Sequence, residues 1–230
     1  MTESYVVVGI HSWSRQAFDK HISGLPGNWS LVSQRQDLDL ARLRAISPRY
    51  IFFFHWSWKV PVEILQEYEC IGFHMADLPY GRGGTPLQNL ILRGHKETML
   101  SAFRLADEMD AGPIYLKENL SLEGSAENIY LRASLLAAQM VRRILEENPQ
   151  PVPQEGEPTV FQRRKPADSE LTGVEGLQAL YDGIRMVDAE GYPRAFVEHG
   201  GFRYQFSNAR LTDGYVEANV IIKPVEPDRS

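Results

Sequence analysis

The sequence predicts an α/β protein, with a doubly wound, Rossmann-like and mostly parallel sheet and a small C-terminal α+β hairpin appendage. Two observations predict the sheet. Short apolar segments, typical of strands buried on both faces, recur through the first half of the chain, and segments of helical period separate them. Two hairpin signals near the C-terminus predict the appendage. Repeated strand–helix alternation favours an open sheet with helices on both faces.

The predicted elements of the first half follow one another closely. The strands are expected at 5–10 (YVVVGI), 29–32 (WSLV), 50–54 (YIFFF) and 70–73 (CIGF). The helices between them are expected near 14–23, at 37–46 with Asp37 as the cap, and at 61–68 with Pro61 in the first helical position. After them come a helix from Thr85-Pro86 to Gly94, a strand pair at 98–105 and 113–122 around DEMDAG, and an amphipathic helix from Ser125 to about Glu147.

A change in composition divides the chain. The Pro- and Glu-rich residues 149–159 are predicted to be a linker between a catalytic domain, 1–148, and a small α+β unit, 160–230. The second unit contains a helical segment, 177–187, and two hairpins with Gly-Gly and Asp-Gly turns at 200–201 and 213–214. These hairpins could pack on their own domain or pair across a homodimer.

Composition excludes several classes of protein. The chain has 230 residues and a formal net charge of -6, which argues against an extended nucleic-acid or anionic-membrane surface. Its single cysteine, Cys70, excludes an intrachain disulfide and gives no metal-cluster spacing. No secretory signal is visible, and the longest apolar stretch, YIFFFHWSW, is too short to cross a bilayer. A soluble cytoplasmic protein is expected, without metal, nucleic-acid or membrane partners.

The stretch GFHMADLPYGRGGTP, residues 72–86, is the most informative in the chain. It places His74 at a strand end, before a Gly- and Pro-rich loop that contains Arg82. Because ligands of doubly wound sheets bind at the carboxyl ends of the strands, we expect His74 to lie at a binding edge with Asp110 as its carboxylate partner. A lone histidine after a strand, or an aspartate in a turn, is more often structural, so neither residue decides the function alone.

A family resemblance adds to these observations. FHMADLPYGRGGTPLQNLILRG followed by LADEMDAGPIYLKENLSL resembles the signature of formyltetrahydrofolate-dependent formyltransferases, the methionyl-tRNA formyltransferase-like superfamily, and the match runs through most of 1–145. FQRRKPADSEL (161–171) and IRMVDAEGYPRAF (184–196) resemble the members that formylate nucleotide-linked amino sugars. Within that group the sequence is most similar to the formyltransferases of pseudaminic acid biosynthesis, which act on a UDP-linked 4-amino-4,6-dideoxy sugar.

The resemblance implies that His74 and Asp110 are catalytic and that N10-formyltetrahydrofolate is the formyl donor. The acceptor amine attacks the formyl carbonyl, and a hydrogen-bond donor at the formyl oxygen stabilises the tetrahedral intermediate. His74, held by Asp110, can be that donor when protonated, and Asp110 can take the amine proton directly or through water. The implied chemistry needs no metal.

Gly72 departs from the family pattern, which has asparagine there as a second donor to the formyl oxygen, and Ala76 replaces the usual small hydroxyl residue. Three interpretations follow. Asn89, on the helix after the loop, replaces the missing donor; or His74 acts with backbone N–H groups or water; or the site is inactive. Since losing one oxyanion donor slows turnover about 10²–10³-fold, a working enzyme is favoured.

Binding residues are carried over by position. The folate donor is expected to contact two loops, 55–61 and 105–110, at Trp56, Trp58, Val60, Leu105, Ala106, Asp107 and Asp110. The sugar nucleotide is expected at His11, Ser12, Trp13, Arg82, Gly83, Thr85 and Asn89, with the cations of 163–165 near its diphosphate. Each set has a plainer interpretation: aromatic residues after a buried strand are commonly core, and a charge run is commonly solvated surface.

Three rival functions remain at this stage. Methionyl-tRNA formyltransferase shares the chemistry, but the short appendage and acidic chain argue against it. Glycinamide ribonucleotide formyltransferase is disfavoured by the extra C-terminal hairpins. A degenerate module that binds folate or a nucleotide sugar without catalysis is supported only by Gly72.

Overall fold

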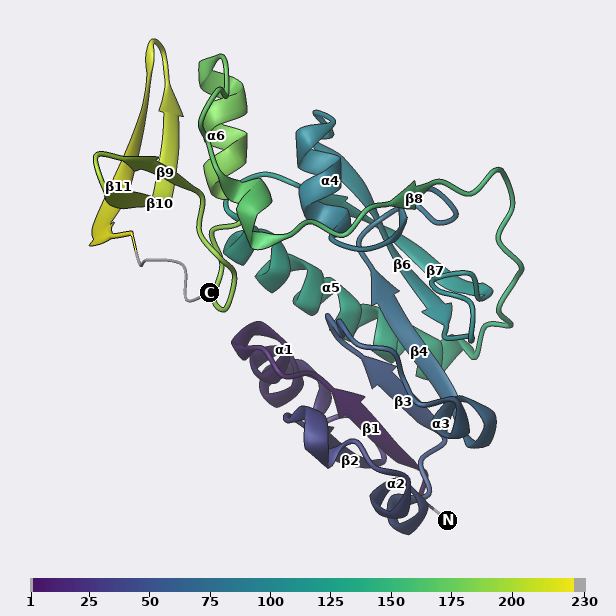
Figure 1. The fold of residues 1–230 in the computed structure, drawn as a ribbon. Helices are drawn as coiled ribbons and strands as arrows, with labels where there is room; N and C mark the ends of the chain where they lie inside the picture. Colours follow the sequence, from purple (N-terminus) through teal and green to yellow (C-terminus); the bar gives the residue numbers. More distant parts are fainter. Residues whose placement is uncertain (1, 226–230) are drawn as a thin grey trace.

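A central six-stranded sheet organises the protein in a computed structural model that describes residues 2–225 (Figure 1). Met1 and 226–230, the end of the predicted C-terminal unit, lie outside the described residues. The strand order is β2-β1-β3-β4-β6-β7. The strands are β1 (Ser4–Val8), β2 (Asn28–Val32), β3 (Tyr50–Phe53), β4 (Glu69–His74), β6 (Glu97–Arg104) and β7 (Ile114–Ser121). Strands β2, β1, β3 and β4 are parallel to one another, while β6 is antiparallel to β4 and β7 is antiparallel to β6. This arrangement confirms the mostly parallel α/β fold.

Helices cover both faces of this sheet. They are α1 (Ser12–Ala17), which continues as a π-helix (Phe18–Ile22), α2 (Leu40–Ile46), α3 (Val62–Glu67), α4 (Pro86–Leu92) and α5 (Ala126–Glu147), with a 3-10 turn at Arg35–Asp37. On one face Val7 and Phe52 pack with α1, α4 and α5; on the other Val6 and Ile51 pack with α2 and α3. Because successive strand residues alternate between two buried faces, the central strands are continuously apolar.

Three boundaries differ from the sequence prediction. The cap of α2 is Asp39, whose carboxylate accepts the Arg42 N–H at 2.9 Å, and the predicted cap Asp37 lies in the preceding 3-10 turn. Pro61 precedes α3 as its N-cap residue rather than beginning the helix. The sequence predicts that β4 ends at Phe73, just before His74, whereas in the structure His74 is the last residue of the strand.

The C-terminal part forms a second, smaller layer at one corner of the molecule (Figure 1). It contains α6 (Leu177–Arg185), a 3-10 turn (Pro166–Ser169) and the antiparallel strands β9 (Phe196–His199), β10 (Phe202–Thr212) and β11 (Tyr215–Pro224). Both hairpin turns lie where the sequence predicts them, and the two hairpins share β10. The order β11-β10-β9 confirms the C-terminal antiparallel sheet.

A buried ion pair joins this layer to the main sheet. Arg185 on α6 donates to Asp182 at 2.6 Å and to the carbonyl oxygens of Leu122 and Gly124 at 2.6 and 2.9 Å. Those carbonyls lie between β7 and α5, so the guanidinium satisfies backbone acceptors that would otherwise be buried without a partner.

The chain between α5 and α6 returns to the loop after β4. In Figure 1 it leaves α5, arcs outside β6 and β7, and comes back through the short strand β8 (Val160–Phe161). There β8 pairs in parallel with β5 (Arg82–Gly83). Among residues 2–225 no helix is long and apolar enough to cross a membrane.

Candidate active site

Three histidines lie at the carboxyl ends of three neighbouring parallel strands. His11 follows β1, His55 follows β3 and His74 ends β4. His74 is buried, and its Nε2 donates to the carbonyl oxygen of Gly81 at 2.7 Å, because a carbonyl can only accept. The other ring nitrogen, Nδ1, lies 3.7 Å from Oδ2 of Asp110. The structure therefore brings together the two residues expected to be catalytic.

Asp110 occupies a constrained turn between β6 and β7. Its φ of 53° is in the left-handed region, which is unfavourable for a residue with a side chain. Oδ2 accepts the backbone N–H of Gly83 at 2.8 Å, and the Asp110 carbonyl accepts from Gln154 at 2.7 Å. The separation of Nδ1 and Oδ2 exceeds a hydrogen bond, so Nδ1 keeps capacity for a reacting group.

An asparagine at Gly72, as in the family pattern, would require neighbouring side chains to move. A Cβ built on Gly72 would lie 2.7 Å from Cδ2 of Leu105 and 3.0 Å from Cε1 of Phe103. Leu105 is anchored there, because its N–H donates to the Cys70 carbonyl at 2.8 Å. The space beside His74 on this face of β4 is thus filled by the leucine expected to contact folate.

Asn89 is fully occupied by structural hydrogen bonds. Its amide nitrogen lies 3.0–3.2 Å from the carbonyl oxygens of Gly84, Thr85 and Gln162, and its Oδ1 accepts from Arg93 at 2.9 Å. An amide has two N–H groups, and both are directed at these carbonyls. The expectation that Asn89 replaces the missing oxyanion donor is therefore not supported by this arrangement.

The loop residues expected to bind substrate also hold the loop itself. Arg82 donates to Oε1 of Gln154 at 3.0 and 2.8 Å and to Glu108 at 3.3 Å. The hydroxyl of Thr85 accepts the backbone N–H of Arg164 at 3.1 Å. With the Gly83 N–H bound to Asp110, these polar groups already have protein partners.

The two expected folate loops meet at an exposed ion pair. Lys59 and Asp107 lie 2.6 Å apart and join loop 55–61 to loop 105–110. Trp56 and Trp58 contact edge to face with centroids 4.9 Å apart, and Trp58 is exposed. The buried indole nitrogen of Trp56 has no hydrogen-bond partner among the described residues. Val60 is a core residue, whereas Ala106 is exposed.

The loop after β1 contributes to an aromatic stack. His11 stacks on Trp13 at 4.5 Å, and Trp13 stacks on Tyr130 at 5.0 Å. Trp13 is fully buried, so in this structure it is a core residue. Ser12 donates to Glu190, and His11 is half-buried. Burial lowers the pKa of His11.

His55 is a further polar residue at this edge that the sequence did not single out. Its φ is 51°, and Nε2 lies 2.9 Å from the hydroxyl of Ser134 on α5. Its ring meets Tyr130 edge to face at 5.2 Å. Burial lowers the pKa of His55 to about 3, so the ring is neutral at ordinary pH.

Residues 152–164 are here called the strap, and of these only Arg163 and Arg164 were expected at the site from the sequence. Backbone hydrogen bonds join Arg82 N–H to the Thr159 carbonyl at 2.9 Å and Gly84 N–H to the Phe161 carbonyl at 3.2 Å. Phe161 packs against Gly81, where a Cβ would lie 2.7 Å from its ring. The positive φ of Gly81, 78°, and this close approach both require glycine. A polar, proline-rich segment carries no local signal for such pairing.

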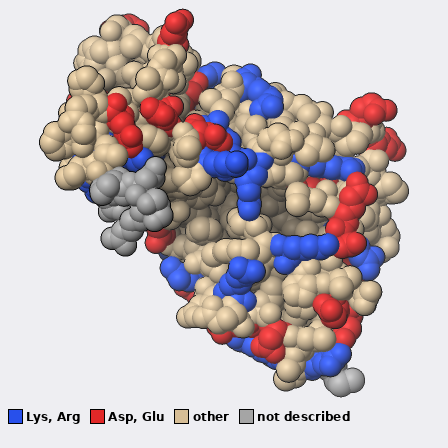
Figure 2. Space-filling view, viewed as in Figure 1, with Lys and Arg blue, Asp and Glu red and all other residues tan. Residues whose placement is uncertain are grey.

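The surface around this edge is hollowed and basic. Figure 2 shows Lys and Arg side chains gathered on the rim of a hollow on the face of the molecule shown there. Arg163 on the strap reaches across to donate to the Ser57 carbonyl at 3.1 Å. Such a rim suits an acceptor that carries phosphate groups.

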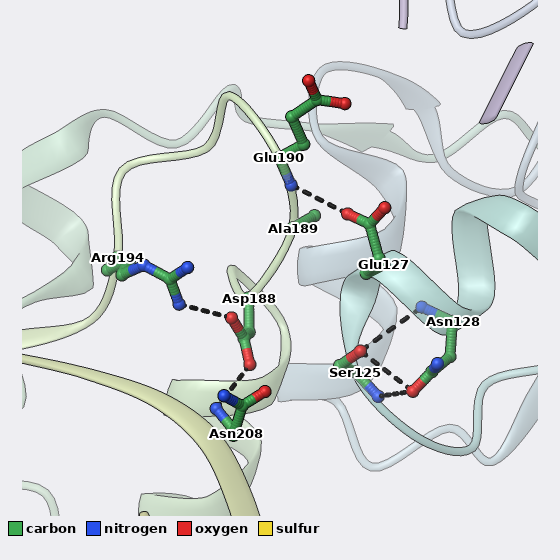
Figure 3. Close-up of a pocket in the computed structure, with 8 residues that line it drawn as sticks. All are labelled: Ser125, Glu127, Asn128, Asp188, Ala189, Glu190, Arg194 and Asn208. Atoms are coloured by element: carbon green, nitrogen blue, oxygen red, sulfur yellow. Dashed lines mark hydrogen bonds and ion pairs between the residues drawn. The ribbon is translucent and has the colours of Figure 1, made fainter. Parts of the chain in front are cut away.

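A second hollow, of about 600 Å³, shares no lining residue with the His74 group (Figure 3). It lies beside the start of α5. Its polar groups pair within its own wall: Arg194 with Asp188 at 2.6 Å, Asp188 with the Asn208 N–H at 2.6 Å, and Glu127 with the Glu190 N–H at 2.8 Å. Within residues 2–225, no group of three or more His, Cys, Asp or Glu residues is arranged to hold a metal ion.

Comparisons with known proteins identify the family. A family model described as "Methionyl-tRNA formyltransferase, C-terminal domain" matches residues 166–223. The solved structure of a methionyl-tRNA formyltransferase from Clostridium thermocellum is 41% identical, with a TM-score of 0.91, over 97% of this chain and 100% of that chain. The chain belongs to the formyltransferase family. Formyltransferases of this family use formyl-tetrahydrofolate, in agreement with the expected donor.

Other relatives differ in length or are distant. The methionyl-tRNA formyltransferase of Thermodesulfovibrio yellowstonii is 23% identical over 82% of this chain, which spans 63% of that curated relative. HypX from Aquifex aeolicus, solved with tetrahydrofolic acid, and a 4-N formyltransferase from Francisella tularensis share the fold, at 15% and 14% identity with TM-scores of 0.73 and 0.66. The HypX match covers 89% of this chain and 37% of the HypX chain. The Francisella match covers 99% of both chains. The superfamily part of the resemblance is confirmed, and the names favour methionyl-tRNA formyltransferases over pseudaminic acid enzymes.

Gly72→Asn should lower the free energy of unfolding by about 1–3 kcal/mol, because its side chain collides with Leu105. In a Leu105→Ala background the same substitution should cost less, by about 1 kcal/mol, since the colliding atoms are gone. Denaturant unfolding of the wild type, the two single variants and the double variant measures this coupling. Gly24→Asn, at a glycine with open space around its Cβ position, is the matched control. Equal costs in both backgrounds would contradict the steric account.

The pH dependence of stability should report His55, which is half-buried beside Ser134. Its pKa is about 3 in the folded state against an ordinary 6.5, so the unfolded chain takes up a proton first on acidification. Stability is therefore lost progressively as pH falls from 6.5 towards 3. The unfolding free energy of His55→Gln should fall less steeply than that of the wild type over this range, with exposed His21→Gln as the control. Parallel curves for wild type and His55→Gln would contradict a neutral ring.

Proposed function

We propose that the protein transfers the formyl group of N10-formyltetrahydrofolate to an amine. The observation that carries the proposal is the pairing of His74 Nδ1 and Asp110 Oδ2, 3.7 Å apart at the carboxyl edge of the sheet. Family membership supports the reaction class, and the preserved loop around the pair supports an active enzyme rather than a relic.

The proposed reaction needs no covalent enzyme intermediate. The acceptor nitrogen forms a bond to the formyl carbon, and the carbonyl electron pair moves onto the formyl oxygen. When this intermediate collapses, the bond from carbon to N10 breaks, and N10 receives the proton that Asp110 has taken from the amine, so that neutral tetrahydrofolate leaves. Asp110 takes the proton that the attacking amine loses, with Oδ1 as the available oxygen because Oδ2 accepts the Gly83 N–H.

His74 is the proposed side-chain donor to the formyl oxygen. Its Nε2 is held by the Gly81 carbonyl, so Nδ1, on the side of Asp110, is the atom that meets the substrate. Because Gly72 has no side chain and the Asn89 amide is engaged, the second donor is a backbone N–H or water. Such an enzyme works with one fewer oxyanion donor, at a cost of about 10²–10³-fold in rate.

The folate donor is proposed to lie between loops 55–61 and 105–110. The unpartnered indole N–H of Trp56 fits an acceptor atom of a heterocycle, and Trp58 offers an exposed ring face. Leu105 would contact the pterin from the sheet side, and the Lys59–Asp107 ion pair would lie at the rim.

Two acceptors merit testing, each on a specific observation. The names of the relatives favour methionyl-tRNA, against the expectation that no nucleic acid takes part. The net charge of -6 favours a smaller acceptor such as a nucleotide-linked amino sugar. Both carry phosphate, which suits the basic rim in Figure 2.

Incubation with N10-formyltetrahydrofolate and each candidate acceptor should yield tetrahydrofolate and one formylated product. Methionyl-tRNA and a panel of UDP- and dTDP-linked amino-dideoxy sugars would be followed by product mass. His74→Ala and Asp110→Ala should each lower the rate about 10²-fold or more. Exposed His199→Ala and Asp213→Ala are the matched controls and should keep the rate.

The outcome also separates the rival functions. Transfer to methionyl-tRNA alone assigns that acceptor, and transfer to one sugar assigns the sugar. If tetrahydrofolate binds but no acceptor is formylated, the protein is a binding module and the proposed function is wrong.

A further inference from the structure

We propose that Gln154, on the strap, is a positioning residue that holds Asp110 at its working distance from His74. The inference rests on the proposed function for its catalytic consequence. Its structural basis is independent, because it comes from a closed ring of hydrogen bonds that passes through both loops of the site.

The side-chain amide of Gln154 binds the Asp110 turn at two backbone positions. Nε2 of Gln154 donates to the carbonyl oxygens of Asp110 and Gly112 at 2.7 and 2.8 Å. The turn needs such an external constraint, because Asp110 has a positive φ and Gly112 is packed so closely on the Arg104 carbonyl that no Cβ fits.

The acceptor end of the same amide reaches the loop after β4. Oε1 of Gln154 accepts from Nε of Arg82 at 3.0 Å and from its terminal nitrogen at 2.8 Å. The next residue, Gly83, donates its N–H to Oδ2 of Asp110 at 2.8 Å. The ring is thus closed: Gln154 binds the Asp110 backbone, the Asp110 carboxylate binds Gly83, and Arg82 beside it binds Gln154.

The chemistry of this ring requires glutamine. Two N–H donors meet two carbonyls, and one carbonyl oxygen meets a guanidinium. A glutamate would keep the contact with Arg82 but would place an oxygen against the carbonyls of Asp110 and Gly112. Gln154→Glu therefore breaks the half of the ring that holds Asp110 and spares the other half.

Loss of this side chain should not release the strap. Val152 and Ile114 exchange both backbone hydrogen bonds, at 2.7 and 2.9 Å. Thr159 bonds through its N–H and its carbonyl to Pro79 and Arg82. Because the backbone is held on both sides of Gln154, the effect of substitution is local to the Asp110 turn.

The first readout needs no activity. Amide hydrogen exchange at Gly83 reports its bond to the Asp110 carboxylate, and it should be about tenfold faster or more in Gln154→Ala and Gln154→Glu. Gln162→Ala is the matched control, because the exposed Gln162 contributes only its backbone carbonyl. Unchanged exchange at Gly83 in both Gln154 variants would overturn the inference.

The second readout is kinetic. In both Gln154 variants kcat should fall by about 10²-fold with the KM for the folate donor nearly unchanged, since Asp110 is displaced without loss of the donor site. A thermal midpoint within about 3 °C of the wild type would separate positioning from unfolding. A Gln154→Glu enzyme with wild-type kcat would overturn the inference. A wild type that formylates no acceptor would instead overturn the proposed function. The exchange rate at Gly83 would still test whether Gln154 holds the Asp110 turn.

Discussion

The parallel pairing of β5 and β8 is the constraint on which the site depends. Two short strands far apart in the sequence hold the loop after β4 through backbone bonds at Arg82 and Gly84. That loop supplies the Gly81 carbonyl, which fixes the ring of His74, and the Gly83 N–H, which fixes the carboxylate of Asp110. The orientation of both candidate catalytic side chains therefore follows from a segment that contributes no catalytic group itself.

The second constraint is steric and decides which oxyanion donors are available. Leu105 fills the space beside Gly72, and the amide of Asn89 holds Gly84, Thr85 and Gln162. A formyl oxygen at this edge can then be met by His74 and by backbone or water, but not by a carboxamide from either position. The proposed formyltransferase site therefore has a reduced set of side-chain donors, and the placement of His74 and Asp110 matters more.

Much of this could be predicted from sequence, for physical reasons. Strands buried on both faces must be apolar, so β1 and β3 were visible as YVVV and YIFF, and Gly-Gly and Asp-Gly turns revealed the C-terminal hairpins. The place of His74 at the carboxyl edge follows from the parallel strands. Asp110 lies beyond the end of β6, which is antiparallel to β4, so its approach to His74 depends on tertiary contacts of the turn. The strap could not be predicted, because its backbone pairing with 82–84 is long-range and leaves no pattern in its side chains. The burial of Trp13 and the hydrogen bonds that occupy the Asn89 amide likewise depend on tertiary neighbours.

The most direct test of the central claim is a crystal structure with a stable N10-formyl analogue of the folate donor. The account predicts the formyl oxygen within hydrogen-bonding distance of His74 Nδ1, the heterocycle between loops 55–61 and 105–110, and Leu105 still beside Gly72. A formyl group bound by the Asn89 amide, or a folate bound away from the His74–Asp110 edge, would contradict it.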